Sequence, residues 1–371
     1  MRSISNFPSG EYKKVLKVYS KFIKRTTASL LFPSLFHTRS HLLLKPFYSG
    51  LGSILMFHRV CPKSSKPRIR GNAGLEVTPE YLENMILFLR KNNYEIVPLG
   101  RVDKILNENL GRKKFAVFTF DDGYIDNYLH AYPILKKYEI PFTIYVTTNF
   151  PEGKAILWWY LLEDLILKES RVEFELNGRG HQFACANLWE KEWVYQEIHS
   201  LILNGPSKEL NQRIQQVLEN SNINLYDKTP ELALTWQQIR EMSQDPLVEI
   251  GAHTINHDVL NKLSESTVQK EIEGSRDKIE AETNQKVEHF CYPFGTRNEV
   301  GEREFKIAKK CGFKTSTTTN AANIFPEHKN LLEQLPRIAV NQKRDGGNIN
   351  YLNLWLSGAL PCVINKFKRV V

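Results

Sequence analysis

The sequence has few of the features that would tie it to a membrane span or a disulfide framework. No apolar stretch reaches the ~18 residues that a spanning helix needs. The cysteine count is odd and no pair has CxxC spacing, which argues against both disulfides and a cysteine-based zinc site and favours a reducing compartment. The five cysteines are Cys61, Cys185, Cys291, Cys311 and Cys362. Repeats and low-complexity tracts are also missing, and 42% apolar with 25% charged residues indicates a globular protein with a sizeable core.

The first 50 residues form a basic extension without a clear secretory signal. The apolar stretch Ala28–Phe36 is short, is broken by Pro33 and is followed by no clear small-residue cleavage site. Tyr12–Lys24 alternates apolar residues with lysines, as a basic amphipathic helix does. Such a helix can lie on an anionic membrane or pack on the folded domain, and both interpretations stay open. We therefore expect a cytoplasmic protein, with peripheral contact at the inner membrane face as one alternative.

The formal net charge is +9, and the surplus is concentrated at the two ends of the chain. A basic surplus is typical of partners such as nucleic acid, an anionic membrane surface or a phosphate-bearing substrate. The sequence has no basic stripe interleaved with aromatic residues and no nucleic-acid module, so we expect no nucleic-acid partner. Residues 346–371 combine apolar residues with a basic end and are predicted to form a C-terminal tail.

From residue 51 onward, short apolar runs alternate with helical patterns, which is typical of a parallel α/β architecture. We predict one domain over residues 51–345, with strands at Phe115–Phe120 and Val248–Ala252 among others. The alternation stops at about residue 151 and resumes at about residue 230. The part between reads as helices and one hairpin, and we interpret it as an insertion on the rim of the domain.

The first cluster of chemical interest is Asp121-Asp122-Gly123, which follows an apolar strand. Two adjacent carboxylates cannot both be buried without a cation or a proton, because like charges at contact distance repel strongly. One can therefore bind a metal while the other holds a water molecule. An ordinary acidic turn is the alternative, since Asp and Gly are both favoured in turns.

The second cluster is His253 and His257, which follow the strand at Val248–Ala252. Two imidazoles four positions apart can converge on one cation if the segment turns helically after the strand. The alternative is a capping or core histidine pair. Because the carboxyl ends of parallel strands meet at one edge of a sheet, one of the two aspartates can complete a set of one carboxylate and two histidines with open positions.

These clusters, followed by a strand that ends in Tyr292-Pro293-Phe294-Gly295, resemble the polysaccharide deacetylase family in their order along the chain. The resemblance implies a distorted (β/α) barrel and a zinc-like divalent metal ion. It implies that Asp121 is the general base. By the same resemblance, the metal ligands are Asp122, His253 and His257, the substrate-binding turn is Tyr292, Pro293 and Phe294, and the Phe294 N–H helps to hold the oxyanion.

The sequence departs from the commonest pattern of this family in two places. Many members carry an arginine before the Tyr-Pro turn that contacts the base aspartate, and here Cys291 occupies that position. Arg337, on a late strand, is a candidate replacement. Many members also end with a Leu-x-His motif that supplies the general acid, and no such motif follows Gly295. A subgroup carries its acid histidine after the first strand, so we assign this role to His58, with a structural hydrogen bond as the alternative.

The resemblance implies a metal-dependent hydrolase that removes an N-acetyl group from an amino sugar in a polysaccharide or lipid-linked glycan. A deformylase of a lipid-linked formamido sugar and a non-catalytic glycan-binding module are the alternatives. Trp158 and Trp159 are candidate platforms for a sugar face, although tryptophans are also common in cores and rims.

Overall fold

The computed structural model describes residues 34–108, 113–204 and 209–371. The amphipathic helix predicted at Tyr12–Lys24 lies outside these ranges. Within them, no helix is long and apolar enough to cross a membrane.

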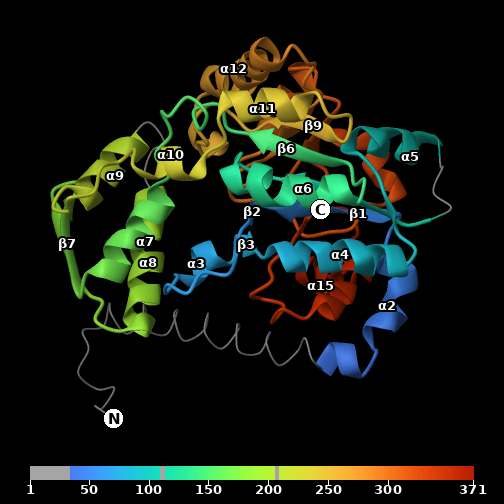
Figure 1. Cartoon of the computed structure of the whole chain (residues 1–371), viewed down its shortest axis with the longest axis horizontal. Coiled ribbons are helices and arrows are strands. Elements are labelled where there is room, and N and C mark those ends of the chain that lie inside the picture. The colour runs from blue at the N-terminus through green and yellow to red at the C-terminus, as the bar shows by residue number, and fades with distance from the viewer. Residues whose placement is uncertain (1–33, 109–112, 205–208) are drawn as a thin grey trace.

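The centre of the molecule is a parallel sheet of eight short strands (Figure 1). Its order is β11-β10-β9-β6-β5-β1-β12, and β4 pairs with β5 at the side of this path. The strands are β1 (Gly52–Phe57), β4 (Glu95–Ile96), β5 (Phe115–Phe120), β6 (Phe142–Val146), β9 (Val248–Ala252), β10 (His289–Cys291), β11 (Thr315–Thr317) and β12 (Ile338–Ala339). Residues in β1, β5 and β6 are buried throughout, as expected for strands covered on both faces.

The two edges of this sheet are joined by the segment that leads into β12. The Leu335 N–H donates to Ser316 O at 2.9 Å, and the Thr318 N–H donates to Leu335 O at 2.9 Å. Three residues further on, the chain pairs with β1 in the register Leu55 to Ile338. The sheet therefore curls into a distorted barrel, which confirms the predicted α/β fold class.

Helices cover the outside of the sheet (Figure 1). They are α4 (Pro79–Lys91), α5 (Val102–Glu108), α6 (Tyr132–Lys137), α11 (Trp236–Ser243), α12 (Glu265–Thr283) and α13 (Glu302–Lys310). α4 shows why these segments are helical: the Thr78 hydroxyl accepts from the Tyr81 N–H, and Pro79 occupies the first helical position. Leu82, Met85 and Leu89 then recur at helical spacing and are fully buried against the barrel.

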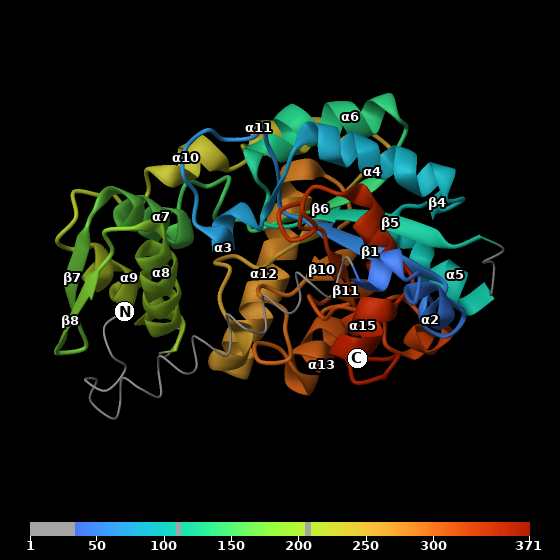
Figure 2. The same ribbon diagram turned by 90° about the horizontal axis from the view of Figure 1, so that it is seen from below.

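Residues between β6 and β9 build a second body beside the barrel (Figures 1 and 2). It contains α7 (Trp158–Lys168), β7 (Arg171–Leu176), β8 (Arg179–Ala184), α8 (Leu188–Leu203), α9 (Leu210–Leu218) and α10 (Lys228–Leu232). Asn177 and Gly178 both have positive φ, which closes the β7–β8 hairpin as predicted. These elements pack mainly on one another in their own apolar cluster. The boundaries of 151 and 230 for this insertion remain a prediction.

The loop after β1 connects the insertion to the barrel. It carries β2 (Arg59–Val60), α3 (Arg70–Ala73) and β3 (Glu76–Val77). The buried Glu163 carboxylate of α7 accepts from the Ile69 N–H at 2.6 Å and from Asn72 Nδ2 at 2.9 Å. Since a buried charge needs such partners, these bonds fix how the loop lies against α7.

The last residues of the chain return to the barrel. α14 (Leu352–Leu356) is buried in the same apolar cluster as the barrel strands, so this part of the predicted tail packs on the core. α15 (Ala359–Ile364) packs beside α2 (His41–Tyr48), which precedes β1 (Figure 2). Gly358 allows this approach because a Cβ there would lie 1.9 Å from Tyr48 O, and its φ is +77°.

Candidate metal centre and catalytic cavity

The predicted site residues follow the carboxyl ends of three strands of the sheet. His58 follows β1, the Asp121-Asp122 pair follows β5, and His253 follows β9. The Asp121 N–H donates to Phe57 O at 2.9 Å, and the His253 N–H donates to Val146 O at 3.0 Å, so strand pairing continues into the site. A cavity of about 350 Å³ opens here, and its lining includes His58, Asp121, Asp122, His253, His257 and Phe294.

Asp122 and the two histidines form a candidate metal centre. Asp122 Oδ1 lies 3.3 Å from Nε2 of His253 and 3.3 Å from Nε2 of His257. Ligand atoms about 2.1 Å from one tetrahedral zinc ion are about 3.4 Å apart, so the spacing fits a shared cation. Asp122 Oδ1 is also buried without a hydrogen-bond partner. An orphaned carboxylate oxygen is costly unless something charged satisfies it, and a divalent cation would do so.

The segment from His253 to His257 reaches this geometry by a different route from the helical turn that we predicted. Thr254 and His257 have positive φ values of 64° and 60°, and the intervening residues form a bend. Glu271 of α12 holds the bend, since its carboxylate accepts from the N–H groups of Ile255 and Asn256 at 3.0 and 2.9 Å. Positive φ is unfavourable for these residues, so the bend needs such support.

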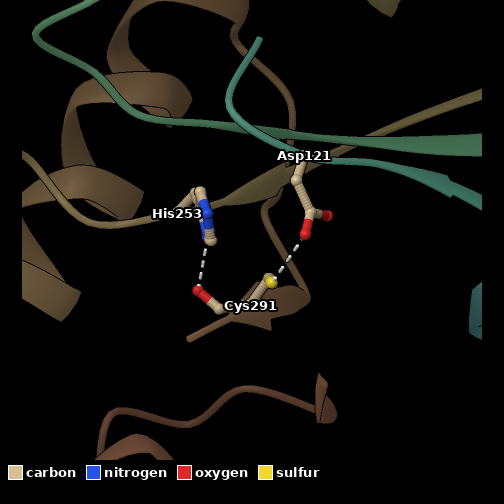
Figure 3. Close-up of side chains that lie close together, drawn as sticks. All are labelled: Asp121, His253 and Cys291. Carbon is tan, nitrogen blue, oxygen red and sulfur yellow. Dashed lines mark hydrogen bonds between the residues drawn. The ribbon is translucent and has the colours of Figure 1, made fainter. Parts of the chain in front are cut away.

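The orientation of the His253 ring is set by the strand beside it. Nδ1 lies 2.7 Å from Cys291 O, and Figure 3 marks this contact with a dashed line. A carbonyl only accepts, so this contact requires a proton on Nδ1 and leaves the Nε2 lone pair toward Asp122.

The Asp121 carboxylate lies against Arg337. The guanidinium donates from Nη1 to Oδ1 at 2.6 Å and from Nη2 to Oδ2 at 2.7 Å. Both residues are almost completely buried. Burial would raise the pKa of Asp121, but the guanidinium outweighs it and lowers the pKa below its ordinary value. The predicted contact of Arg337 with Asp121 is therefore confirmed.

Comparison with known proteins identifies the family of this chain. The sequence profile described as polysaccharide deacetylase matches residues 108–316, more than half of the chain. The chain belongs to the polysaccharide deacetylase family. The Bacillus subtilis protein YxkH is 24% identical over 267 residues, which cover 72% of this chain and 63% of the relative. The chain thus spans less than two thirds of that protein's length.

Two solved structures share the fold. The Streptococcus pyogenes deacetylase PplD in complex with acetate is 22% identical with a TM-score of 0.53, covering 82% of this chain and 97% of that one. IcaB from Ammonifex degensii is 18% identical with a TM-score of 0.51, covering 83% of this chain and 98% of that one. The chain therefore shares the barrel fold of these two structures at low sequence identity.

The stretch that matches the family profile, residues 108–316, contains neither His58 nor Arg337. His58 follows β1 and Arg337 precedes β12, and these strands are neighbours in the sheet. The His58 side chain is partly exposed to the cavity. Burial lowers its pKa, against the opposing effect of the Asp122 and Asp121 carboxylates. The role of general acid for His58 remains a prediction.

A second group of potential ligands lies beside the first. Asp121, His253 and Cys291 bring one donor atom each within 4.8 Å of one another (Figure 3). Arg337 Nη2 lies 3.0 Å from Cys291 Sγ, however, and the fixed guanidinium charge repels a cation there. Burial also raises the pKa of the Cys291 thiol well above its usual value, and a thiolate is the form that binds metal. The Asp122 group is the better metal centre.

The predicted substrate-binding turn is only partly in the cavity. Phe294 lines it, with its ring centroid 5.0 Å from that of His257. The Phe294 N–H makes no hydrogen bond to the described residues, which leaves it available to a ligand. Tyr292 and Pro293 do not line the cavity, and the Tyr292 hydroxyl donates instead to Glu333 O at 2.8 Å. Substrate binding by these two residues remains a prediction without structural support.

The opposite wall of the cavity comes from the insertion. Trp158 and Trp159 of α7 and Gln196 and His199 of α8 line it, and His199 packs on Trp158 with ring centroids 4.9 Å apart. Burial lowers the pKa of His199 to about 4, so its imidazole is neutral at neutral pH. The sequence analysis missed Gln196, His199 and Glu271. Gln196 and His199 are related only by their helical spacing along α8, and no local sequence motif identifies any of the three residues.

Proposed function

We propose that this protein is a metal-dependent hydrolase that removes an N-acetyl group from an amino sugar of a polysaccharide or lipid-linked glycan. The observation that carries the proposal is the pair of adjacent aspartates. One faces two imidazoles at metal-ligand spacing and the other is an ionised carboxylate in the same cavity. Membership of the polysaccharide deacetylase family supports the reaction class.

In this proposal Asp122, His253 and His257 hold the cation. One carboxylate and two imidazoles suit zinc, which leaves positions open for water and substrate. When bound, such a cation supplies Lewis acidity, which polarises an amide carbonyl and acidifies a water molecule. The Nδ1–H bond from His253 to Cys291 O keeps the ring in the tautomer that this task needs.

Asp121 is the proposed general base. The bidentate contact with Arg337 keeps its carboxylate ionised and fixes its direction. Each carboxylate oxygen has two lone pairs, so the contact leaves capacity to accept a proton from water. The Phe294 N–H is the proposed donor to the oxyanion that forms when water adds to the amide.

His58 is the proposed general acid, since an amine leaves an amide only when it receives a proton. Its imidazole shares the cavity with Asp121. Because burial lowers the pKa of His58, the protonated ring is a stronger acid than an exposed histidine. The nearby carboxylates favour its transient protonation during the reaction.

The test is acyl release from a panel of N-acetylated glycans, lipid-linked N-acetyl sugars and their formamido counterparts, with and without chelator. Acetate release that stops with chelator and returns with added zinc supports the proposal. Release of formate alone identifies the deformylase, which the same geometry would serve. Glycan binding with no acyl release under any metal condition identifies a binding module and overturns the hydrolase proposal.

A further inference from the structure

One region of the surface gathers most of the large apolar side chains that are exposed. Of eleven such residues in the described parts of the chain, six lie on α2, on α15 or in the turn after α15. We call them the α2–α15 face: Leu42, Leu43, Phe47, Val363, Ile364 and Phe367. Their exposed fractions run from 47% to 76%. Exposed apolar residues that gather in one place are typical of an interaction surface.

Side-chain contacts hold the two parts of the α2–α15 face together. The Tyr48 ring of α2 contacts the Phe367 ring at a centroid distance of 6.4 Å, and the Arg369 guanidinium lies 5.7 Å from the Tyr48 centroid. Lys366 and Phe367 are consecutive residues with positive φ, 51° and 65°. This strained turn leaves the Phe367 side chain 65% exposed.

Every charged side chain carried by these segments is a cation. Residues 34–75 and 346–371 contain no Asp or Glu. The cations beside the apolar residues are Arg39, Lys45, Lys366, Lys368 and Arg369, which are all exposed. None of them makes an ion pair within the described parts of the chain. The face therefore combines apolar side chains with uncompensated positive charge.

We propose that the α2–α15 face is a docking surface for an anionic phospholipid bilayer. Short helices that present Leu and Phe together with Lys and Arg suit the boundary between headgroups and acyl chains. There the apolar side chains can contact the acyl chains while the cations stay among the anionic headgroups. A second copy would place the same cations against each other about a two-fold axis, which is repulsive. Lysine is also depleted at protein interfaces.

The docking surface and the cavity lie at opposite ends of β1. α2 leads into the amino end of this strand at Gly52, whereas His58 follows its carboxyl end. No residue lining the cavity belongs to α2 or α15. A docked molecule therefore keeps its cavity free of the lipid contact, so vesicle binding and turnover of a water-soluble substrate are separate measurements.

The experiment is flotation of the full chain with vesicles of phosphatidylcholine alone or mixed equally with phosphatidylglycerol. The face variant carries Leu43→Ser, Phe47→Ser and Ile364→Ser. The control carries Leu129→Ser and Trp189→Ser, two apolar residues elsewhere that are 51% and 61% exposed. We expect binding to the mixed vesicles only, weaker at high salt, and about a tenfold or larger loss of affinity in the face variant. The control should bind like the parent.

A charge variant with Lys45→Gln, Lys366→Gln and Lys368→Gln should lose affinity for the mixed vesicles as well. Unchanged binding in both the face and the charge variants overturns the proposal. So does loss of binding only on replacing Lys14, Lys17 and Lys21 by Gln, which assigns binding to the first 33 residues. A dimer in sedimentation that the face variant abolishes assigns the face to a second copy. Thermal unfolding shows whether each variant folds, and activity on a soluble glycan shows whether the proposed function holds independently.

Discussion

The barrel mouth and the insertion line the same cavity but are built in different ways. At the mouth, charged groups such as Asp121 and Arg337 are buried and paired, and backbone strain is concentrated, with Asp122, His257 and Phe294 all at positive φ. The insertion wall has neutral and aromatic groups on regular helices. Strained, charged groups are typical of sites of chemistry, and regular aromatic walls are typical of binding surfaces. Mutations should therefore affect turnover at the mouth and affinity on the wall.

The largest effect is expected at the candidate metal centre. His253→Ala removes one ligand and should lose bound metal and turnover together, by more than the ~10²–10⁴-fold of a general-base variant. Metal content by mass spectrometry and acyl release are the two measurements. His130→Ala, outside the cavity, is the control. Normal metal content and activity in His253→Ala would show that the ligand assignment is wrong.

The next effect concerns the buried ion pair at the mouth. Asp121→Asn should keep the metal but lower turnover by about 10²–10⁴-fold. It also leaves Arg337 buried without a countercharge, which should cost about 3–5 kcal/mol in the free energy of unfolding. Adding Arg337→Gln should recover part of that stability and none of the activity. A double variant no more stable than Asp121→Asn would contradict the coupling between these two residues.

The third prediction concerns the pH dependence of stability in the insertion. His199 titrates near its ordinary pKa of about 6.5 when unfolded and at about 4 when folded. Between these values the unfolded chain binds the extra proton, so acidification destabilises the fold, and above pH 6.5 the effect vanishes. Between pH 6.5 and 4, the free energy of unfolding should fall by about 2 kcal/mol less in His199→Gln than in the parent protein. Urea unfolding at each pH measures it, and parallel curves for both proteins would refute it.

The smallest effect is expected on the wall itself. Gln196→Ala removes an exposed side chain that lines the cavity. We expect KM to rise severalfold, up to about tenfold, with kcat nearly unchanged, because the contact is equal in ground and transition states. Gln182→Ala, an exposed glutamine of the hairpin, is the control. A fall in kcat with unchanged KM would place Gln196 in the chemistry and break the contrast between wall and mouth.

The same contrast explains how much the sequence could predict. The aspartate and histidine pairs are local motifs at strand ends, and parallel strands bring such ends together whatever lies between. The contact of Arg337 with Asp121 was only a hypothesis because it depends on how the barrel closes. Gln196 and His199 were missed because their place depends on how α8 docks. Tyr292 was expected in the cavity, but its hydroxyl bonds to Glu333 O instead.

The pairing of Asp121 with Arg337 also sets the order in which this site can form during folding. The two residues are 216 positions apart, and the arginine arrives with the segment that enters β12. Such distant contacts form late, because a long loop loses entropy before the contact is gained. A folding intermediate that has not docked this segment holds a buried carboxylate with no countercharge. The missing countercharge makes this intermediate unfavourable, so we expect docking of the β12 segment and assembly of the reactive centre to be coupled.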